Sequence, residues 1–221
     1  LSEESTENAG LCFAYADDIA LSSHSTLPAA LKAFESDLQI HVAEMSPQSV
    51  FVHAGVVSWK ERVILLPGRT ISGKSTLVRQ LVQTGALYYS DEYAVLDTTG
   101  RVHPHPGPLS IRHERGATRY RIETLGGRAG QEAAPVSLVV MTRFRATARF
   151  QPVRLSPGRG ALALLANTVP ARRHPEAALA TLGKIVTSAP VFESDRPDAC
   201  DVADAILDLA ESLPDRRTED R

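Results

Sequence analysis

The chain of 221 residues is 43% hydrophobic and 23% charged, and its formal net charge at pH 7 is −2. These values are ordinary for a globular protein with a buried core, and the near-neutral charge argues against a general nucleic-acid binder. Two cysteines, Cys12 and Cys200, are too few for a disulfide framework and lack the spacing of metal ligands.

Hydrophobic runs in the chain are short. None approaches the roughly 20 apolar residues needed to span a bilayer, and the acidic start at residues 1–7 lacks the pattern of a signal peptide. We therefore expect a cytoplasmic protein that acts without a membrane or a nucleic acid as partner. The oligomeric state stays open, with a homo-oligomer as one alternative.

Residues 1–48 are predicted to form a small N-terminal α+β lobe. Residues 11–16 and 19–22 are typical of the two strands of a hairpin. Thr26 can cap a helix that follows. The apolar residues of this helix recur at helical spacing at Leu27, Leu31, Phe34 and Leu38.

Residues 49–213 are predicted to form the main domain, an α/β core. Apolar, β-branched runs at residues 50–57 and 63–66 predict two buried strands. A glycine-rich segment follows the second run. A helix is expected from Gly73 to Gln83, and Gly85 is suited to end it.

The rest of the core alternates strands, loops and helices. Three strands are expected at residues 87–90, 93–97 and 101–104. Residues 112–135, rich in arginine and glycine, predict a mobile loop. A strand over 136–141 and a partner strand over 148–155 come next. Helices are expected over 158–165, 175–186 and 199–213, and the tail 214–221 is expected to be disordered.

The glycine-rich segment has the pattern glycine, four residues, then Gly-Lys-Ser, which is typical of loops that hold nucleotide phosphates. Two glycines let the backbone turn tightly, so that successive N–H groups point at phosphate oxygens. The helix that follows adds its positive N-terminal end. The predicted cofactor-binding residues are Gly68, Arg69, Thr70, Ile71, Ser72, Gly73, Lys74, Ser75 and Thr76.

Two side chains of this segment have distinct predicted roles. Lys74 can reach the β- and γ-phosphates, and the Ser75 hydroxyl can ligate Mg²⁺. A chain of this length matches the pattern by chance roughly once in a hundred. Its position between an apolar strand and a helix lowers that chance further, so we predict a nucleotide and Mg²⁺ as cofactors. The alternative is an ordinary strand-to-helix turn.

A phosphate loop needs a carboxylate to complete its Mg²⁺ site, and Asp91 and Glu92 are the nearest candidates. The predicted helix of about eleven residues carries the chain roughly 16 Å away from the loop. A strand of about six residues then returns it by roughly 20 Å. We therefore expect the Asp91 carboxylate to face Lys74 and Ser75 across a cleft. The alternative is a plain acidic turn after a strand.

The stretch from His53 to Arg112 resembles the catalytic domain of the HPr kinase/phosphorylase family, including related kinases of peptide-biosynthesis clusters. Four features carry the resemblance: a histidine-containing strand, the phosphate loop, a strand that ends in two acids, and a proline-rich segment. They lie at residues 53–57, 68–76, 89–92 and 103–110. The resemblance implies an α/β fold with a P-loop and a mixed sheet, related to the phosphoenolpyruvate carboxykinase core.

The resemblance also implies an activity. It is the ATP- and Mg²⁺-dependent transfer of the γ-phosphoryl group to a serine hydroxyl of a peptide or protein. Asp91 would accept the seryl proton, Lys74 would neutralise charge on the phosphoryl group, and His53 would lie close to the same phosphates. Ser75, Glu92 and Asp91 would hold Mg²⁺. Taken alone, a histidine in an apolar strand such as His53 is typical of a protein core.

The chain departs from the family pattern at two places. The second acid is Glu92 where the bifunctional enzymes usually have aspartate. The later family signature is reduced to residues 121–127, in which Glu123 is a candidate metal ligand. These departures favour a dedicated kinase without phosphorylase activity, acting on a substrate other than HPr.

Other functions remain open from the sequence. A small-molecule kinase could use the same loop, and so could a nucleotide-binding module without transferase activity. A basic stretch in the predicted mobile loop is either a solvated loop or a lid that orders on nucleotide or docks an acidic peptide. It contains Arg112, Arg115, Arg119 and Arg121.

Overall fold

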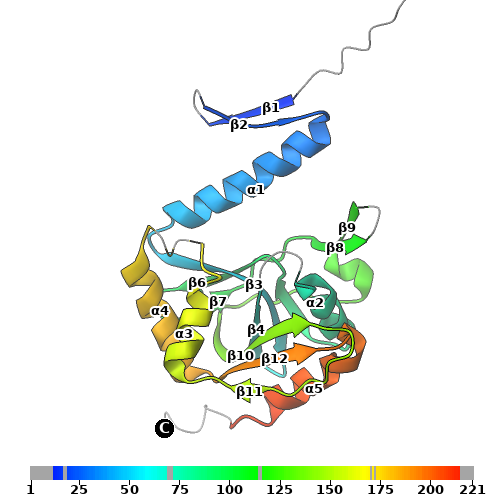
Figure 1. Cartoon of the computed structure of the whole chain (residues 1–221), viewed down its shortest axis with the longest axis vertical. Coiled ribbons are helices and arrows are strands. Elements are labelled where there is room, and N and C mark those ends of the chain that lie inside the picture. Colours follow the sequence, from blue (N-terminus) through cyan, green and yellow to red (C-terminus); the bar gives the residue numbers. More distant parts are fainter. Residues whose placement is uncertain are drawn as a thin grey trace, which may run out of the picture. The chain divides into compact units, whose positions relative to one another are not determined.

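The computed structural model describes residues 12–16, 19–68, 72–113, 116–169, 171 and 173–214. The chain divides into two compact units, Leu1–Met45 and Ser46–Arg221 (Figure 1). Within the described residues, no helix combines the length and the apolar character needed to cross a bilayer.

The first unit is a hairpin and a helix. Strands β1 (Cys12–Ala16) and β2 (Ile19–His24) pair antiparallel. Helix α1 (Leu27–Met45) follows, and the Ala29 N–H donates to Thr26 Oγ1 at 3.4 Å. Thr26 therefore caps the helix as its sequence predicts, and the expected order of strand, strand and helix is confirmed.

The second unit contains a mixed sheet, which confirms the predicted α/β class. Its described strands run in the order β11-β12-β10-β4-β3-β6-β7, with β5 beside β3. They are β3 (Ser49–Trp59), β4 (Arg62–Pro67), β5 (Leu87–Ser90), β6 (Tyr93–Asp97), β7 (Arg101–His103), β10 (Ala134–Phe144), β11 (Val153–Arg154) and β12 (Val191–Arg196). Because β10 also pairs with β7, part of the sheet closes into a ring.

Strand direction defines the edge of the sheet that matters for function. Strands β4, β10 and β12 are parallel, so their carboxyl ends lie at one edge of the sheet. Strand β3 is antiparallel to β4, and its register places Ala54 opposite Pro67 at this same edge. Ligands of α/β sheets bind outside the carboxyl ends of parallel strands, so a binding site is expected at this edge.

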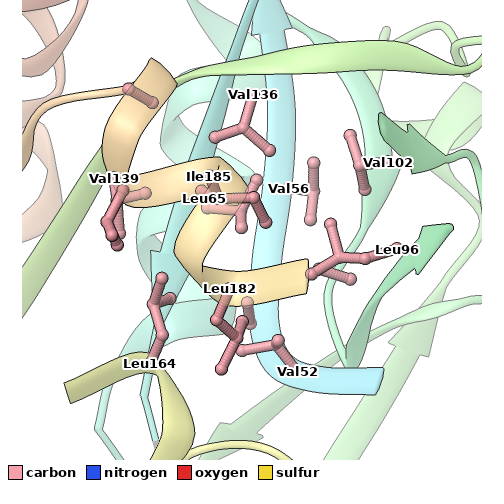
Figure 2. Close-up of a cluster of buried hydrophobic side chains, with 14 of the residues drawn as sticks. Val52, Val56, Leu65, Leu96, Val102, Val136, Val139, Leu164, Leu182 and Ile185 are labelled. Carbon is pink, nitrogen blue, oxygen red and sulfur yellow. The ribbon is translucent and has the colours of Figure 1, made fainter. Parts of the chain in front are cut away.

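Helices cover both faces of the sheet, because its central strands alternate buried side chains between two cores. Helices α3 (Pro157–Leu165) and α4 (Pro175–Ser188) cover one face, where Leu65 packs in the same cluster as Leu182 (Figure 2). Helices α2 (Lys74–Gln83) and α5 (Ala199–Glu211) belong to the other cluster, with Ile64 and Leu66. Both layers are thus encoded by the near-continuous apolar runs of β3 and β4.

The prediction of a mobile loop over residues 112–135 is wrong. Strands β8 (Leu109–His113) and β9 (Gly116–Tyr120) pair as a hairpin, and a 3-10 helix covers Ile122–Leu125. Further on, the Gly130 N–H donates to the Tyr88 carbonyl at 2.8 Å. A Cβ on Gly130 would lie 2.1 Å from the Tyr89 ring. Glycine at this position therefore allows the backbone to pack closely against the ring.

The strand predicted over residues 148–155 is much shorter in the structure. Only Val153–Arg154 (β11) is extended, and it pairs with β12 instead of β10. Strand β12 was not expected from the sequence, because residues 191–196 contain only two apolar side chains. It is nevertheless a parallel neighbour of β10 over six residue pairs.

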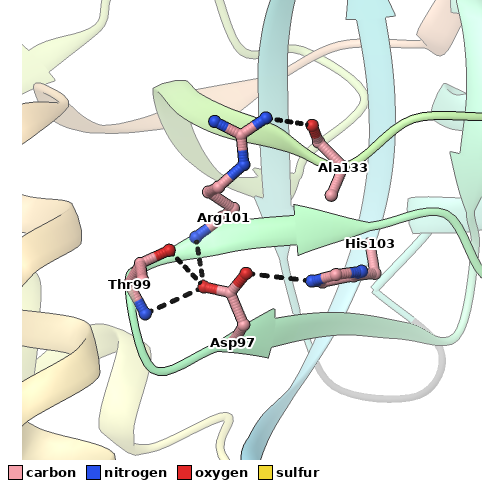
Figure 3. A network of polar contacts seen from close by, with 5 residues as sticks. All are labelled: Asp97, Thr99, Arg101, His103 and Ala133. Carbon is pink, nitrogen blue, oxygen red and sulfur yellow. Dashed lines mark hydrogen bonds and ion pairs between the residues drawn. The ribbon is translucent and has the colours of Figure 1, made fainter.

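The turn between β6 and β7 is organised by one carboxylate (Figure 3). Asp97 Oδ1 accepts hydrogen bonds from the Thr99 N–H at 2.8 Å, the Thr99 hydroxyl at 2.6 Å and the Arg101 N–H at 3.1 Å. Asp97 Oδ2 lies 2.9 Å from His103 Nε2. The Arg101 guanidinium in turn donates to the Ala133 carbonyl, next to β10. Burial would raise the pKa of Asp97, but these bonds outweigh it and lower the pKa.

We expect Asp97→Ala to lower the free energy of unfolding by about 1–2 kcal/mol, because it leaves the turn donors without their acceptor. Asp97→Asn keeps one acceptor oxygen and should lose less. Since the folded pKa lies below the ordinary value of 3.8, the charged network stabilises the fold above that pH and is lost on acidification. Urea denaturation at pH 7 and pH 3 measures both effects. Equal stability of Asp97→Ala and the parent at pH 7 would contradict this account.

Candidate active site

Backbone hydrogen bonds join three segments at the carboxyl edge of the sheet. The Gly68 N–H, directly after β4, donates to the His53 carbonyl at 3.1 Å. The Ala54 N–H donates to the Glu92 carbonyl at 3.3 Å. Strand β3 therefore lies between the end of β4 and the corner after β5, and it brings residues 53, 68 and 91 within reach of each other.

The two glycines at the ends of the β4–α2 connection (residues 68–73) lie in the part of the chain that the structure describes. Gly73 has φ 76°, in the left-handed region where a side chain is strained. A Cβ on Gly68 would lie 2.7 Å from Ser72 Oγ. Backbone geometry therefore requires glycine at position 73, while at position 68 a side chain would need Ser72 to move. The predicted phosphate ligands Arg69, Thr70 and Ile71 lie outside the described residues.

Lys74 begins helix α2 and is buried, with a relative exposure of 9%. Its Nζ donates to the Gly68 carbonyl at 3.2 Å and lies 3.1 Å from His53 Nδ1. Burial lowers the pKa of Lys74, and the negative charges of Asp91 and Glu92 oppose that effect. Burial and then the Lys74 charge lower the pKa of His53 to about 4. His53 is therefore neutral at pH 7, and its Nδ1 accepts a hydrogen bond from the Lys74 ammonium.

Asp91 directly follows β5 and has a buried carboxylate, with a relative exposure of 8%. Burial raises its pKa to about 6, and hydrogen bonding to the Ser75 side chain, the Lys74 charge and the Ser110 backbone pull it down. Its Oδ1 is buried and has no hydrogen-bond partner among the described residues. Because buried polar atoms are nearly always paired, an unpaired carboxylate oxygen marks a place for a ligand.

The donor set at this point fits Mg²⁺. The carboxylate of Asp91 and the hydroxyl of Ser75 are the hard oxygen ligands that Mg²⁺ prefers, and they are neighbours in the structure. The described part of the chain holds no group of three or more His, Cys, Asp or Glu side chains with metal-binding geometry. A Mg²⁺ ion here would therefore depend on water and phosphate oxygens for its other ligands, as is usual for this ion.

Ser90 has a positioning role that the sequence did not reveal. Its Oγ accepts hydrogen bonds from the Glu92 N–H at 3.3 Å and the Tyr93 N–H at 3.2 Å. These bonds fix the corner between β5 and β6, on which Asp91 lies. Serine before a turn is a recognised signal for such bonds, so this contact could have been predicted.

The structure brings together only some of the predicted site residues. One edge of the sheet brings together six of them, namely His53, Gly68, Gly73, Lys74, Ser75 and Asp91. The side chains of Glu92 and Thr76 are exposed, although the Glu92 charge acts on Lys74. Glu123, the weakest metal candidate, instead forms an ion pair with Arg121 at 3.6 Å.

A second residue that the sequence did not reveal is Arg196, at the end of β12. Its relative exposure is 2%, and its Nη2 donates to the Gly73 carbonyl at 2.9 Å and the Ser72 carbonyl at 3.4 Å. No sequence pattern distinguishes this arginine, because it lies in a polar stretch far from the motif in the chain.

Comparison with known proteins finds a weak resemblance of this chain to a solved structure. No family model and no curated protein matches the chain. The solved structure of the Hpr(Ser) kinase/phosphatase from Coxiella burnetii is similar, at 13% identity and a TM-score of 0.39. The match covers 76% of this chain and 97% of that one. A similarity of this size assigns neither family nor activity, so the functional conclusion depends on the site residues.

We expect Asp91→Asn to raise the free energy of unfolding at pH 7 by about 1–3 kcal/mol. The folded pKa of about 6 lies above the ordinary 3.8, so ionisation of Asp91 costs stability as the pH rises from about 4 through about 6. Asparagine has the same size and carries no charge. The gain should vanish at pH 4 and appear at pH 7 in urea denaturation. A variant less stable than the parent at pH 7 would show that the carboxylate is compensated in the fold.

Proposed function

We propose that this chain is an ATP- and Mg²⁺-dependent kinase that transfers the γ-phosphoryl group to a serine hydroxyl of a peptide or protein. One observation carries the proposal. Two buried opposite charges, Lys74 and Asp91, converge at the start of α2, and Oδ1 of Asp91 has no partner among the described residues. Strongly perturbed charged groups of this kind cluster at catalytic sites.

The β4–α2 connection and the start of α2 would bind the phosphates of the nucleotide. Backbone N–H groups at a helix N-terminus, together with its dipole, favour an anion. The Lys74 ammonium adds a full positive charge at the same end. When bound, the Mg²⁺ nucleotide supplies the phosphoryl group and a cation that stabilises its charge. Ser75 and Asp91, with Glu92 next in the chain, are the residues that would hold the Mg²⁺.

Asp91 is the general base in this proposal. With a pKa of about 6 it is ionised at pH 7, and its Oδ1 is free to accept the proton of the acceptor hydroxyl. The acceptor oxygen forms the new bond to the γ-phosphorus as the bond to the β-phosphate oxygen breaks. Lys74 neutralises charge on the transferred group. Neutral His53 accepts from the ammonium and so fixes its position.

A peptide or protein acceptor is favoured over a small molecule by the hairpin beside the site. The backbone of Ser110 in β8 is close enough to Asp91 to lower its pKa. The same hairpin exposes Arg112 and Arg119, which suits an acidic segment near the acceptor serine. The resemblance of residues 53–110 to HPr-kinase-related enzymes supports serine as the acceptor. The alternatives are a small-molecule kinase and a nucleotide-binding module without transferase activity.

The proposal is tested by incubating the protein with ATP, Mg²⁺ and a panel of serine-containing peptides, with free serine as the small-molecule comparison. Phosphopeptide should form and be seen by mass spectrometry. Asp91→Asn should bind nucleotide but transfer about 10²–10⁴-fold more slowly. Asp204→Asn, which changes an exposed carboxylate on α5, is the matched control. Normal transfer by Asp91→Asn would remove Asp91 as the base, and phosphorylation of free serine alone would favour the small-molecule alternative.

The pH dependence gives an independent check. Because the base must be ionised, kcat/KM should fall about tenfold per pH unit below about pH 6 and level off above pH 7. His53 stays neutral across this range, so no second limb from its titration is expected near pH 6.5. A profile that is flat between pH 5 and pH 7 would contradict a base with the pKa of Asp91.

A further inference from the structure

Arg196 is a buried cation whose charge is met by carbonyl oxygens. Its Nη2 donates to the carbonyls of Gly73 and Ser72, and its Nη1 donates to the Pro197 carbonyl at 3.0 Å. Its Nε donates to Thr142 Oγ1 at 3.3 Å. Among the described residues no carboxylate forms an ion pair with it, although the more distant charge of Asp198 raises its pKa while burial lowers it. Buried charges are normally paired at contact distance, so this guanidinium favours an anion near this edge of the sheet.

Packing also holds the guanidinium in place. Its central carbon lies 5.5 Å from the centre of the Phe144 ring, at the end of the neighbouring strand β10. A Cβ on Gly73 would lie 2.5 Å from Nη2, so the guanidinium occupies the space that a side chain at position 73 would need. The arginine and the left-handed glycine therefore depend on each other.

The two bonded carbonyls determine where the adjoining N–H groups point. In a trans peptide the C=O and the N–H point in opposite directions. The Ser72 carbonyl shares its peptide with the Gly73 N–H, and the Gly73 carbonyl shares its peptide with the Lys74 N–H. Since Arg196 binds both carbonyls, both N–H groups are turned away from it. A cation on the carbonyl also polarises the peptide and makes its N–H a stronger donor.

The other end of the connection is held in a similar way. Lys74 Nζ donates to the Gly68 carbonyl at 3.2 Å. The Gly73 carbonyl also accepts the Leu77 N–H at 3.2 Å, which begins the hydrogen bonding of α2. The Gly73 carbonyl therefore accepts hydrogen bonds both from α2 and from Arg196 at the end of β12. The position of Arg196 thus affects the start of the helix.

We propose that Arg196 is a positioning residue that holds the peptide groups of residues 72–74 in an anion-binding orientation and so sets the affinity for the polyphosphate end of the nucleotide. This inference rests on the proposed function, because it needs a phosphate ligand at this connection. It assigns to Arg196 no contact with the nucleotide. Its effect passes through the peptide groups at residues 72–74 and through the positive potential behind them.

The test measures binding of inorganic tripolyphosphate, ADP and AMP by calorimetry. Arg196→Met should weaken tripolyphosphate and ADP at least tenfold and AMP less than threefold, so that the ratio of ADP to AMP affinity falls. Arg145→Met is the matched control. It removes a cation of the same region that is 60% exposed and bonded to Asp195 at 3.0 Å, and it should leave all three affinities within twofold.

Two results overturn the inference while the proposed function stands. One is an unchanged affinity for both ADP and AMP in Arg196→Met, and the other is an equal loss for both ligands, as a merely structural role would give. If the methionine variant fails to fold, Arg196→Lys keeps the charge but cannot bond both carbonyls and Thr142 together. It should weaken ADP about three- to tenfold with AMP unchanged, and parental ADP affinity overturns the inference. Failure of the parent protein to bind tripolyphosphate or ADP defeats the proposed function, and the inference with it.

Discussion

The pairing of β3 with β4 is the constraint on which the rest of the site depends. Lys60 and Glu61 form the tight turn between these strands, both with positive φ, and fix a register in which Ala54 lies opposite Pro67. His53 and Gly68 therefore meet at the carboxyl edge, and the Lys74 ammonium bridges them. A slip of one residue in this register would turn every side chain of β3 to the opposite face and separate the three groups.

The site is a concentration of buried charge in a fold that otherwise buries apolar groups on both faces of its sheet. Lys74, Asp91 and Arg196 are each less than a tenth exposed. Burial lowers the pKa of Lys74 and raises the pKa of Asp91, so it favours the neutral form of each side chain. The other interactions of these two side chains do not fully offset this loss of hydration. Such an arrangement lowers the stability of the folded chain and is expected where activity, not stability, has been selected.

Local patterns predicted which residues lie together at the carboxyl edge of the sheet better than they predicted the periphery of the fold. The glycines at 68 and 73, the lysine after them and the acid at 91 are fixed by short-range geometry, namely a turn, a helix start and a strand length. Arg196 and Gly73 are 123 positions apart in the sequence, and no local pattern around Arg196 predicts their contact. The sequence did not predict strand β12 for a related reason. Its composition is polar, and it is a strand because it pairs with β10 in the folded chain. Residues 112–135 lack periodicity, yet backbone hydrogen bonds and close glycine packing order them.

Strand β10 pairs with β4 near its middle and has different neighbours at its two ends. Its first two residues pair with β7 and close the ring, and its last six pair with β12, which ends at Arg196. The residues between these two parts pair with β4, so an insertion of one residue there would shift the alignment of β10 with β4 or with β12. A shift against β12 would move Arg196 by a residue relative to Gly73. A length change in the middle of β10 would therefore disturb the sheet and the site together, and tolerated insertions belong in the connection after residue 144.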